Sequence, residues 1–304
     1  MTDIATAFEA NRSFLWGLAY RLTGSAADAD DVVQTTFLRA MERPPRDRTR
    51  PWRPWLVRVA VNAGRDLLRR RRRRPYDGPW LPTPIEPEEG EPPSFEPVDA
   101  DATPLARYEL LESLSIAFLV ALEALTPNQR AVLLLRDAFD YTVREAATAL
   151  EMSEDNVKST HRRARLRMAA YDERRSSDSA AATGEVLERF LGALARGDVP
   201  AVEALLAEDV VHLSDAGGEF ASARAPVRGR ARVARLYLGL AEKGRGRTGM
   251  ALCRLNGQPA AVVAVQSDDR RSAPRLTLHV QLDPEGRICG LFTVLASAKL
   301  ARVS

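Results

Sequence analysis

The sequence lacks a long apolar segment, a recognisable signal peptide and a framework of cysteines. Its only two cysteines among 304 residues, Cys253 and Cys289, lie in apolar, strand-like contexts, so we expect buried thiols. No stretch is apolar enough to span a bilayer, and Asp3, Glu9 and Arg12 interrupt the first twenty residues. These absences argue against a disulfide-rich secreted scaffold and a transmembrane protein, and they predict a cytoplasmic protein of several domains.

Basic residues are missing from one stretch and crowded into another. Residues 69–74 are six consecutive arginines, whereas every charge from Asp77 to Asp101 is acidic. The formal net charge of +3 conceals this segregation. A basic module beside an acidic connector indicates a polyanionic partner, with the connector repelled from the bound surface. By itself, the arginine run leaves three interpretations open: a solvated tail, a targeting signal, or a surface that binds a polyanion.

Hydrophobic periodicity divides the chain into three ordered blocks. The first two, residues 1–74 and 105–172, are predicted to be helical, and a Pro- and Glu-rich connector at 75–104 is expected to be extended and mobile. After a short connector at 173–183, the last block, 184–304, has two short helices followed by strand-like runs. It therefore predicts an α+β domain with helices packed on a curved antiparallel sheet.

Helix start and stop signals sharpen these predictions. Gly24 ends the first helix, and Ser25 opens the next with a Ser-x-x-Asp pattern. Capping boxes begin at Thr126 and Thr142, and Ser153 caps a final basic helix. Two short helices and a tight turn before a basic helix have the rhythm of a helix-turn-helix motif.

The final helix of this motif has one apolar and one basic face. Its apolar residues recur at helical spacing and are expected to face Ala147 on the preceding helix: Val157, His161, Ala164 and Met168. The opposite side carries the candidate DNA-binding residues: Asn156, Lys158, Ser159, Arg162, Arg163 and Arg165. Arginine and lysine suit phosphates and guanine, and asparagine and serine suit base edges. A solvated face of an ordinary helical bundle is the alternative.

Glu151 and His161 are unusual residues for this motif. Glu151 stands in the turn where glycine is usual, and we expect the turn to avoid the left-handed conformation that a side chain disfavours. We expect His161 to pack against the core instead of binding a metal, because no cluster of ligand residues lies nearby in sequence.

The first two blocks together resemble the group IV (extracytoplasmic-function) sigma factors, the promoter-recognition subunits of bacterial RNA polymerase. Region 2 of that family is matched by FLWGLAYRLTGSAADADDVVQTTFLRAM through WLVRVAVNAGRDLLRRRRRRP, and region 4 by ALTPNQRAVLLLRDAFDYTVREAATALEMSEDNVKSTHRRARLRM. The resemblance implies two all-α domains that bind the RNA polymerase core and promoter DNA. It implies no enzymatic activity, cofactor or metal.

The resemblance also implies roles for particular residues. The third helix of region 2 would read the promoter −10 element through Asn62, Arg65, Asp66, Arg69 and Arg70. Holding a melted strand requires phosphate neutralisation and a pocket for an unstacked base, and the arginine run would supply the former. The helix after Ser153 would read the −35 element.

For the polymerase core, the resemblance implies contacts with the clamp region of the β′ subunit and with the β flap. The residues that match the clamp-docking region are Asp28, Asp31, Val32, Gln34 and Phe37. The alternative for the aspartates is a local one, because acidic side chains are favoured at a helix N-terminus.

The last block resembles a SnoaL-like domain of the NTF2-like superfamily, a cone of sheet and helices around a pocket. WLPTP at 80–84 is similar to the linker motif Trp-Leu-Pro-Glu-Pro of sigma factors that carry such an extension, and 213–240 is similar to their Asp-Gly-Gly-Gly signature. The usual C-terminal Asn-Pro-Asp-Lys-Leu is reduced to residues 297–300. The resemblance implies contacts between linker and extension through Trp80, Leu81, Pro82, Asp215, Gly217 and Gly218.

His212 and His279 are candidates to line a pocket for a small-molecule ligand in this last block. Alternation puts His279 on the strand face opposite Leu276 and Leu278, and a His–Asp pair with Asp215 would permit acid–base chemistry. A non-catalytic regulatory domain is the expectation, because no third group completes a site. The sequence thus predicts a sigma factor modulated by its own extension. The alternatives are a ligand-responsive helix-turn-helix regulator that acts without polymerase, and an enzyme fused to a DNA-targeting module.

Overall fold

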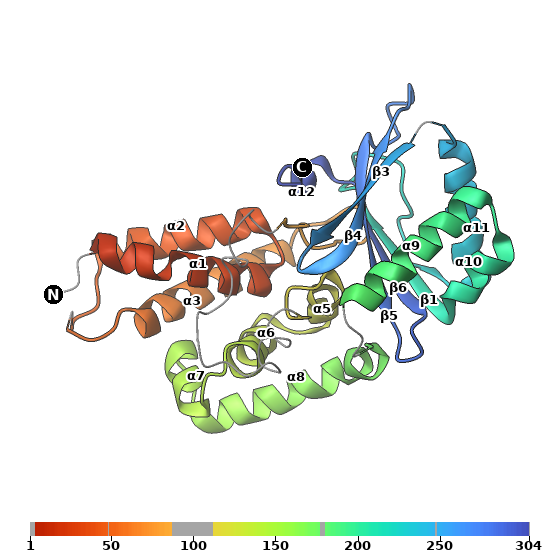
Figure 1. Ribbon diagram of the computed structural model, residues 1–304. Helices are drawn as coiled ribbons and strands as arrows, with labels where there is room; N and C mark the ends of the chain where they lie inside the picture. The colour runs from red at the N-terminus through yellow and green to blue at the C-terminus, as the bar shows by residue number, and fades with distance from the viewer. Residues whose placement is uncertain (1–3, 48, 87–111, 177–179, 247, 304) are drawn as a thin grey trace. The chain divides into compact units, whose positions relative to one another are not determined.

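The computed structural model describes residues 4–47, 49–86, 112–176, 180–246 and 248–303, which form two compact units (Figure 1). The described residues up to 75, together with 112–114 and 121–169, form the first unit. Residues 76–86, 115–120 and those from 170 onward form the second. The expected connector therefore begins inside the second unit, and its remainder, 87–104, lies outside the described residues. No helix of the described ranges is both long and apolar enough to cross a bilayer.

Three helices open the first unit and pack against one another: α1 (Ile4–Thr23), α2 (Ala26–Glu42) and α3 (Arg53–Arg71). Gly24 ends α1 with a positive φ of 69°, and its N–H donates to the carbonyl of Tyr20. The hydroxyl of Ser25 then accepts the N–H of Asp28, so the predicted cap between the two helices is present. These local signals set where α1 ends and where α2 begins.

The rest of the first unit is also helical. It contains the 3₁₀ turn η1 (Leu122–Ala124), α6 (Pro127–Leu133), the π-helical turn η2 (Leu134–Ala138), α7 (Val143–Leu150) and the part of α8 (Glu154–Arg174) that ends at residue 169. Both predicted capping boxes form: Thr126 exchanges hydrogen bonds with Gln129, and Thr142 exchanges them with Glu145. Helices α7 and α8 are the two helices of the predicted helix-turn-helix.

The turn between α7 and α8 differs from the expectation. Glu151 ends α7 in the left-handed conformation, with φ of 54° and ψ of 46°, and its N–H donates to the carbonyl of Ala147. The expectation that this turn would avoid that conformation is wrong. Ending α7 abruptly requires a left-handed residue at this position, and for a non-glycine residue this costs about 1 kcal/mol.

The second unit contains a six-stranded sheet in the order β2-β1-β6-β5-β4-β3. Its strands are β1 (Leu206–Asp215), β2 (Val227–Arg228), β3 (Thr248–Leu255), β4 (Gln258–Val265), β5 (Arg275–Leu282) and β6 (Ile288–Val294). Tight turns close two hairpins: Asn256 and Gly257 have positive φ, and the carboxylate of Asp283 accepts the N–H groups of Glu285 and Arg287. Because β1 pairs with β6 in parallel, the sheet is mixed, and the expectation of an antiparallel sheet is wrong in this respect.

The two faces of this sheet bury different partners. Helices α9 (Ala180–Arg196), α10 (Val199–Leu205) and α11 (Arg230–Gly244) cover one face, where Phe190 and Tyr237 pack with Leu278 and Leu291 (Figure 1). The other face carries Phe292 and Val294. It is covered by linker residues, by the part of α5 (Ile116–Ala121) in this unit, and by α12 (Ser297–Leu300). The predicted α+β architecture is confirmed, and its second face binds segments from the middle of the chain.

Both cysteines belong to this sheet. Cys253 on β3 and Cys289 on β6 are free thiols, as expected. Burial raises the pKa of Cys289 to about 11, so its thiol stays protonated at neutral pH.

Candidate DNA, polymerase and linker interfaces

The five candidate −10 residues lie along the C-terminal half of α3. Asn62 and Arg65 are half-buried and adjacent, because the guanidinium of Arg65 donates to the Asn62 amide oxygen at 3.0 Å. Burial and the nearby charge of Arg69 lower the pKa of Arg65, whose Nε has no hydrogen-bond partner among the described residues. One turn further, Asp66 and Arg69 form an exposed ion pair at 2.8 Å. This surface combines positive charge with unsatisfied donor capacity, which suits an anionic strand.

The arginine run is not uniform. Arg69 and Arg70 are exposed, whereas Arg71 donates to the carbonyl of Thr23 at 2.7 Å and Arg72 donates to that of Leu125. The run therefore divides into solvent-facing arginines and arginines that hold the first unit together, which periodicity alone did not distinguish. Trp52, just before the start of α3, is buried in the core and offers no surface for an unstacked base.

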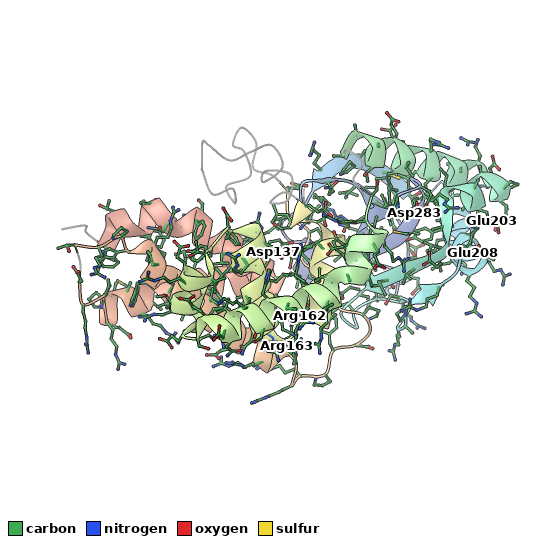
Figure 2. The ribbon with its side chains drawn as sticks, turned by 90° about the horizontal axis from the view of Figure 1, so that it is seen from below. Asp137, Arg162, Arg163, Glu203, Glu208 and Asp283 are labelled. Atoms are coloured by element: carbon green, nitrogen blue, oxygen red, sulfur yellow. The ribbon has the colours of Figure 1, made fainter. Side chains whose placement is uncertain are left out.

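Helix α8 presents the candidate −35 residues as predicted. Val157, Ala164 and Met168 are buried on one side. The six polar and basic candidates are exposed on the other, with Arg162 and Arg163 projecting from the helix (Figure 2). Sequence reasoning missed Asp137, on the π-helical turn, whose carboxylate lies 2.6 Å from Nε2 of His161 and 3.5 Å from the guanidinium of Arg165. His161 therefore helps to hold α8 against the π-helical turn η2.

Helix α2 places the candidate docking residues in two different environments. Asp31 and Gln34 are exposed and Asp28 is half-buried. Val32 and Phe37, however, are only 1% and 6% exposed, and the ring of Phe37 packs on another ring, that of Phe8, at 4.1 Å. Both side chains belong to the core of the first unit, so their implied role as contact residues stays a prediction that their burial does not support.

The exposed face of α2 instead includes two large apolar side chains that the sequence reasoning did not name. Leu38 is 48% exposed and Met41 is 56% exposed. Together with Asp31 and Gln34 they recur at spacings of three and four residues, which places all four on one face of the helix. We call these four residues the α2 face.

In the second unit, Asp215 binds the linker. This carboxylate at the end of β1 is 0% exposed. It accepts hydrogen bonds from the hydroxyl of Tyr76 at 2.6 Å, the N–H of Leu81 at 2.7 Å and the N–H of Gly217 at 3.0 Å. Nζ of Lys299 lies 2.6 Å away and supplies the compensating charge. Contacts with this one buried carboxylate thus hold together the linker, the turn after β1 and the C-terminal helix α12.

Two further contacts hold the same linker segment. The ammonium of Lys299 lies 4.3 Å from the ring centroid of Trp80 and also donates to the carbonyl of Leu81. At the other end, Ile85 and Asn256 exchange hydrogen bonds of 2.8 and 3.1 Å. The structure brings the predicted residues Trp80, Leu81 and Asp215 together. Lys299 lies in the remnant of the C-terminal motif at 297–300, and Asn256 is a contributor that the resemblance did not name.

The two glycines of the predicted signature form the turn beside this carboxylate. Gly217 and Gly218 both have positive φ, and a Cβ on Gly218 would lie 3.2 Å from the Asp77 carboxylate of the linker. Pro82, the remaining predicted linker residue, is buried with its neighbours.

His212 and His279 do not share a pocket. His212 pairs in register with Leu291, on the face covered by helices, and its Nδ1 lies 3.0 Å from the hydroxyl of Tyr237. His279 pairs with Phe292, on the opposite face. Burial lowers the pKa of His212 to about 4 and that of His279 to about 3, so both are neutral at pH 7. The predicted common pocket is therefore wrong, and no acid–base pair with Asp215 is formed.

A separate hollow of about 420 Å³ opens on the surface near the start of α11. Its charged lining comes from Glu203, Glu208, Arg228, Arg230 and Arg232; the two glutamates are marked in Figure 2. Three guanidinium groups face two carboxylates here, so the carboxylates neutralise most but not all of the positive charge of the lining.

Two protein-family models match the chain. The model described as Sigma-70 region 2 matches residues 7–74, and the model described as Sigma-70, region 4 matches residues 115–168. The first covers α1 to α3, and the second runs from α5 into α8.

Similarity to individual proteins extends over nearly the whole chain. The chain is 37% identical to the ECF RNA polymerase sigma factor SigJ of Mycobacterium tuberculosis, over 94% of this chain and 90% of that protein. It is 32% identical to SigG of the same species, over 88% of this chain and 75% of that protein. The crystal structure of the SigJ protein matches with a TM-score of 0.74 at 31% identity and covers 98% of both chains.

Neutralising the buried carboxylate should release the linker. In Asp215→Asn the ammonium of Lys299 loses its buried counter-charge, which costs about 3 kcal/mol, and the linker loses its strongest acceptor. We expect chymotrypsin to cut the full-length variant at Tyr76 or Trp80 at least tenfold faster than the wild type. Asp268→Asn, at an exposed position of the same domain, is the matched control. Equal cleavage rates in the two variants would contradict the anchoring role of Asp215.

The two buried histidines should make the last block of the chain, residues 184–304 and from here on the third domain, sensitive to acid. Between pH 6.5 and about 4 the unfolded chain binds a proton at His212 that the folded chain does not. His279 behaves in the same way, so stability should fall as the pH is lowered, by about 1.4 kcal/mol per unit for each of the two histidines. Hydrogen exchange of β1 and β5, corrected for intrinsic rates, measures this loss between pH 7 and pH 5. His279→Gln should reduce the slope and His161→Gln, outside this domain, should not; an unchanged slope in His279→Gln would refute the account.

Proposed function

Because this chain belongs to the extracytoplasmic-function sigma factors, the promoter-recognition subunits of bacterial RNA polymerase, we propose that its third domain sets the spacing between regions 2 and 4. The observation that carries this proposal is the capture of linker residues by the buried carboxylate of Asp215. The protein itself is a transcription initiation factor and not an enzyme.

Promoter reading is divided between α3 and α8. The half-buried Arg65 beside Asn62, and the exposed Arg69 and Arg70, suit the phosphates and unstacked bases of a melted −10 strand. The exposed basic face of α8 suits the major groove of a −35 duplex, with Arg162 and Arg163 as its central cations. His161 and Asp137 lie beneath this surface, and their contact holds α8 in position.

The α2 face is the docking surface for the polymerase core. Asp31 and Gln34 offer polar contacts, and Leu38 and Met41 supply exposed apolar area of the kind that anchors protein interfaces. The partner for this face is the clamp region of the β′ subunit, and region 4 meets the β flap. In this role the protein works in the cytoplasm, where the polymerase acts.

The third domain controls both ends of the connector between the two reading regions. The chain leaves the second unit after residue 86 and returns to it at 115, and the sheet face bearing Phe292 packs against both Leu81 and Ile116. Holding both ends on one rigid surface fixes the separation of the points from which regions 2 and 4 continue. A free connector of this length would allow a broad range of separations.

The alternatives are less well supported. A helix-turn-helix regulator acting without polymerase would not need the region 2 helices or their exposed α2 face. The small-molecule ligand considered for the third domain finds no support at His212 and His279, which lie on opposite faces of the sheet. The regulation proposed here is mechanical and needs no ligand.

Spacing control is tested by transcription with purified core polymerase. A promoter selected by the wild-type holoenzyme is rebuilt with its spacer between the −35 and −10 elements shortened or lengthened by single base pairs. The wild type should show a sharp optimum, and Asp215→Asn should bind core normally but show a broadened one, because its linker is released. A profile in Asp215→Asn as sharp as that of Asp268→Asn would refute spacing control.

The α2 face is tested by co-elution with core polymerase. Leu38→Ala with Met41→Ala should weaken association at least tenfold without lowering the unfolding midpoint, because both side chains are exposed. Leu240→Ala, an exposed leucine on α11, is the matched control. Phe37→Ala should instead destabilise the fold by about 3 kcal/mol. Undiminished co-elution of the double variant would exclude this face as the docking surface.

A further inference from the structure

Helix α11 and the strand before it carry a dense cluster of basic residues. Residues 220–246 contain seven basic residues and one acidic residue, Glu242. The basic residues are Arg224, Arg228, Arg230, Arg232, Arg235, Lys243 and Arg245, and all of them except the half-buried Arg230 are exposed. Since α11 has 15 residues, the cluster extends for about 22 Å along the helix. We call these seven residues the α11 basic surface.

The outer face of α11 forms the centre of this surface. Val233 and Tyr237 on the inner face are buried, and Arg232 and Arg235, three positions apart, lie on the opposite face. In the part of the chain that the structure describes, the guanidinium groups of Arg228, Arg232 and Arg235 form no hydrogen bond or ion pair. Their donors are therefore available to a partner from outside the chain.

The hollow near the start of α11 adds a concave region to the same surface. Its three guanidinium groups, from Arg228, Arg230 and Arg232, outnumber the two carboxylates. Nε of Arg230 donates to the carbonyl of Leu206 at 3.0 Å, which holds this side chain in place. Guanidinium groups pair with phosphate oxygens through parallel N–H donors, and six of the seven basic residues are arginines. The chemistry of the surface thus favours a polyanion that carries phosphates.

A glycine interrupts the same face of α11. Gly239 lies four positions after Arg235, in the interior of the helix, and a Cβ there would meet no atom of another described segment within 4 Å. Packing within the described chain therefore does not require glycine at this position, although glycine disfavours a helix interior. A helix surface without a side chain lets a second backbone approach closely. This arrangement suits a long, rigid partner such as a duplex.

We propose that the α11 basic surface binds the phosphate backbone of duplex DNA, as a third, sequence-independent contact beside those proposed for α3 and α8. The chain belongs to the promoter-recognition subunits of RNA polymerase, so duplex DNA is the polyanion that its activity brings close. Tethering to the two promoter-reading regions raises the local concentration of duplex at the third domain. The inference goes beyond spacing control and does not need the linker to be anchored at Asp215.

Binding is tested on the full-length chain with a fluorescent duplex of about 30 base pairs without promoter elements, between about 50 and 200 mM salt. Arg232→Gln with Arg235→Gln should weaken binding at least fivefold at the lower salt concentration. The slope of log Kd against log salt should fall by about two, because two phosphate contacts are lost. Both side chains are exposed, so the unfolding midpoint should not change.

A matched pair of single variants locates the contact. Arg235→Gln should lower the slope by about one. Arg254→Gln removes the same charge from β3, at the opposite edge of the sheet from β2, and should leave the slope unchanged. Equal losses in the two variants would overturn the proposal, because net charge alone would then explain them. A wild-type chain that does not bind the duplex would overturn it as well.

Gly239→Gln tests the surface without a change of charge. Glutamine favours the helix and has room within the chain, so the fold is retained while the new side chain keeps the duplex backbone away from α11. Affinity should fall at least threefold. Leu240→Gln, at the exposed neighbouring position, is the control and should change affinity less than twofold. Undiminished binding by Gly239→Gln would exclude contact between the duplex and this face.

An acidic protein surface is the other class of partner that would attract these arginines. Loss of co-elution with core polymerase in Arg232→Gln with Arg235→Gln, at unchanged duplex affinity, would identify such a surface and refute the proposal. Unchanged co-elution with weakened duplex binding supports it. The spacer-length profile tests spacing control separately, because this double variant should keep the sharp optimum of the wild type.

Discussion

The buried carboxylate of Asp215 is the constraint on which the second unit depends. A charged oxygen pair with no solvent exposure is stable only if donors surround it, and here four donor residues come from three separate segments of the chain. Satisfying this one group therefore orders the linker, the turn after β1 and the C-terminal helix together. These contacts join linker residues 76–86 to the third domain. The predicted connector, at 75–104, is therefore not separate from the second unit in the structure.

The first unit depends on a comparable arrangement in which the buried charge is positive instead of negative. There a buried cation, Arg130, requires an acid and two carbonyl groups, and the acid also binds Arg71. In both units a polar group that cannot remain unpaired in the interior connects segments distant in sequence. Apolar packing supplies most of the stability, and these polar groups determine which segments meet.

Sequence reasoning succeeded where the determining interactions are local. The caps at Ser25, Thr126 and Thr142 formed as predicted, because each depends on residues three positions apart. It failed where the deciding partner is remote. The partner of Asp215 is Lys299, 84 positions away, and the parallel pairing of β1 with β6 spans a similar distance.

Resemblance to a family also has a physical limit. It implied a docking role for α2 but did not distinguish the buried side of this helix, which carries Val32, from its exposed side, which carries Leu38. Likewise, strand alternation placed His279 correctly within β5, but only the pairing of whole strands revealed that His212 faces the other way.

Glu151 has two opposite effects: its left-handed conformation strains the backbone, and its side chain forms an ion pair with Arg58. Glycine there would relieve the backbone strain and make the helix-turn-helix more robust. It would also remove the carboxylate that faces Arg58. A search for thermostable variants would therefore tend to select this replacement, and the more stable protein would have lost an ion pair between this turn and α3.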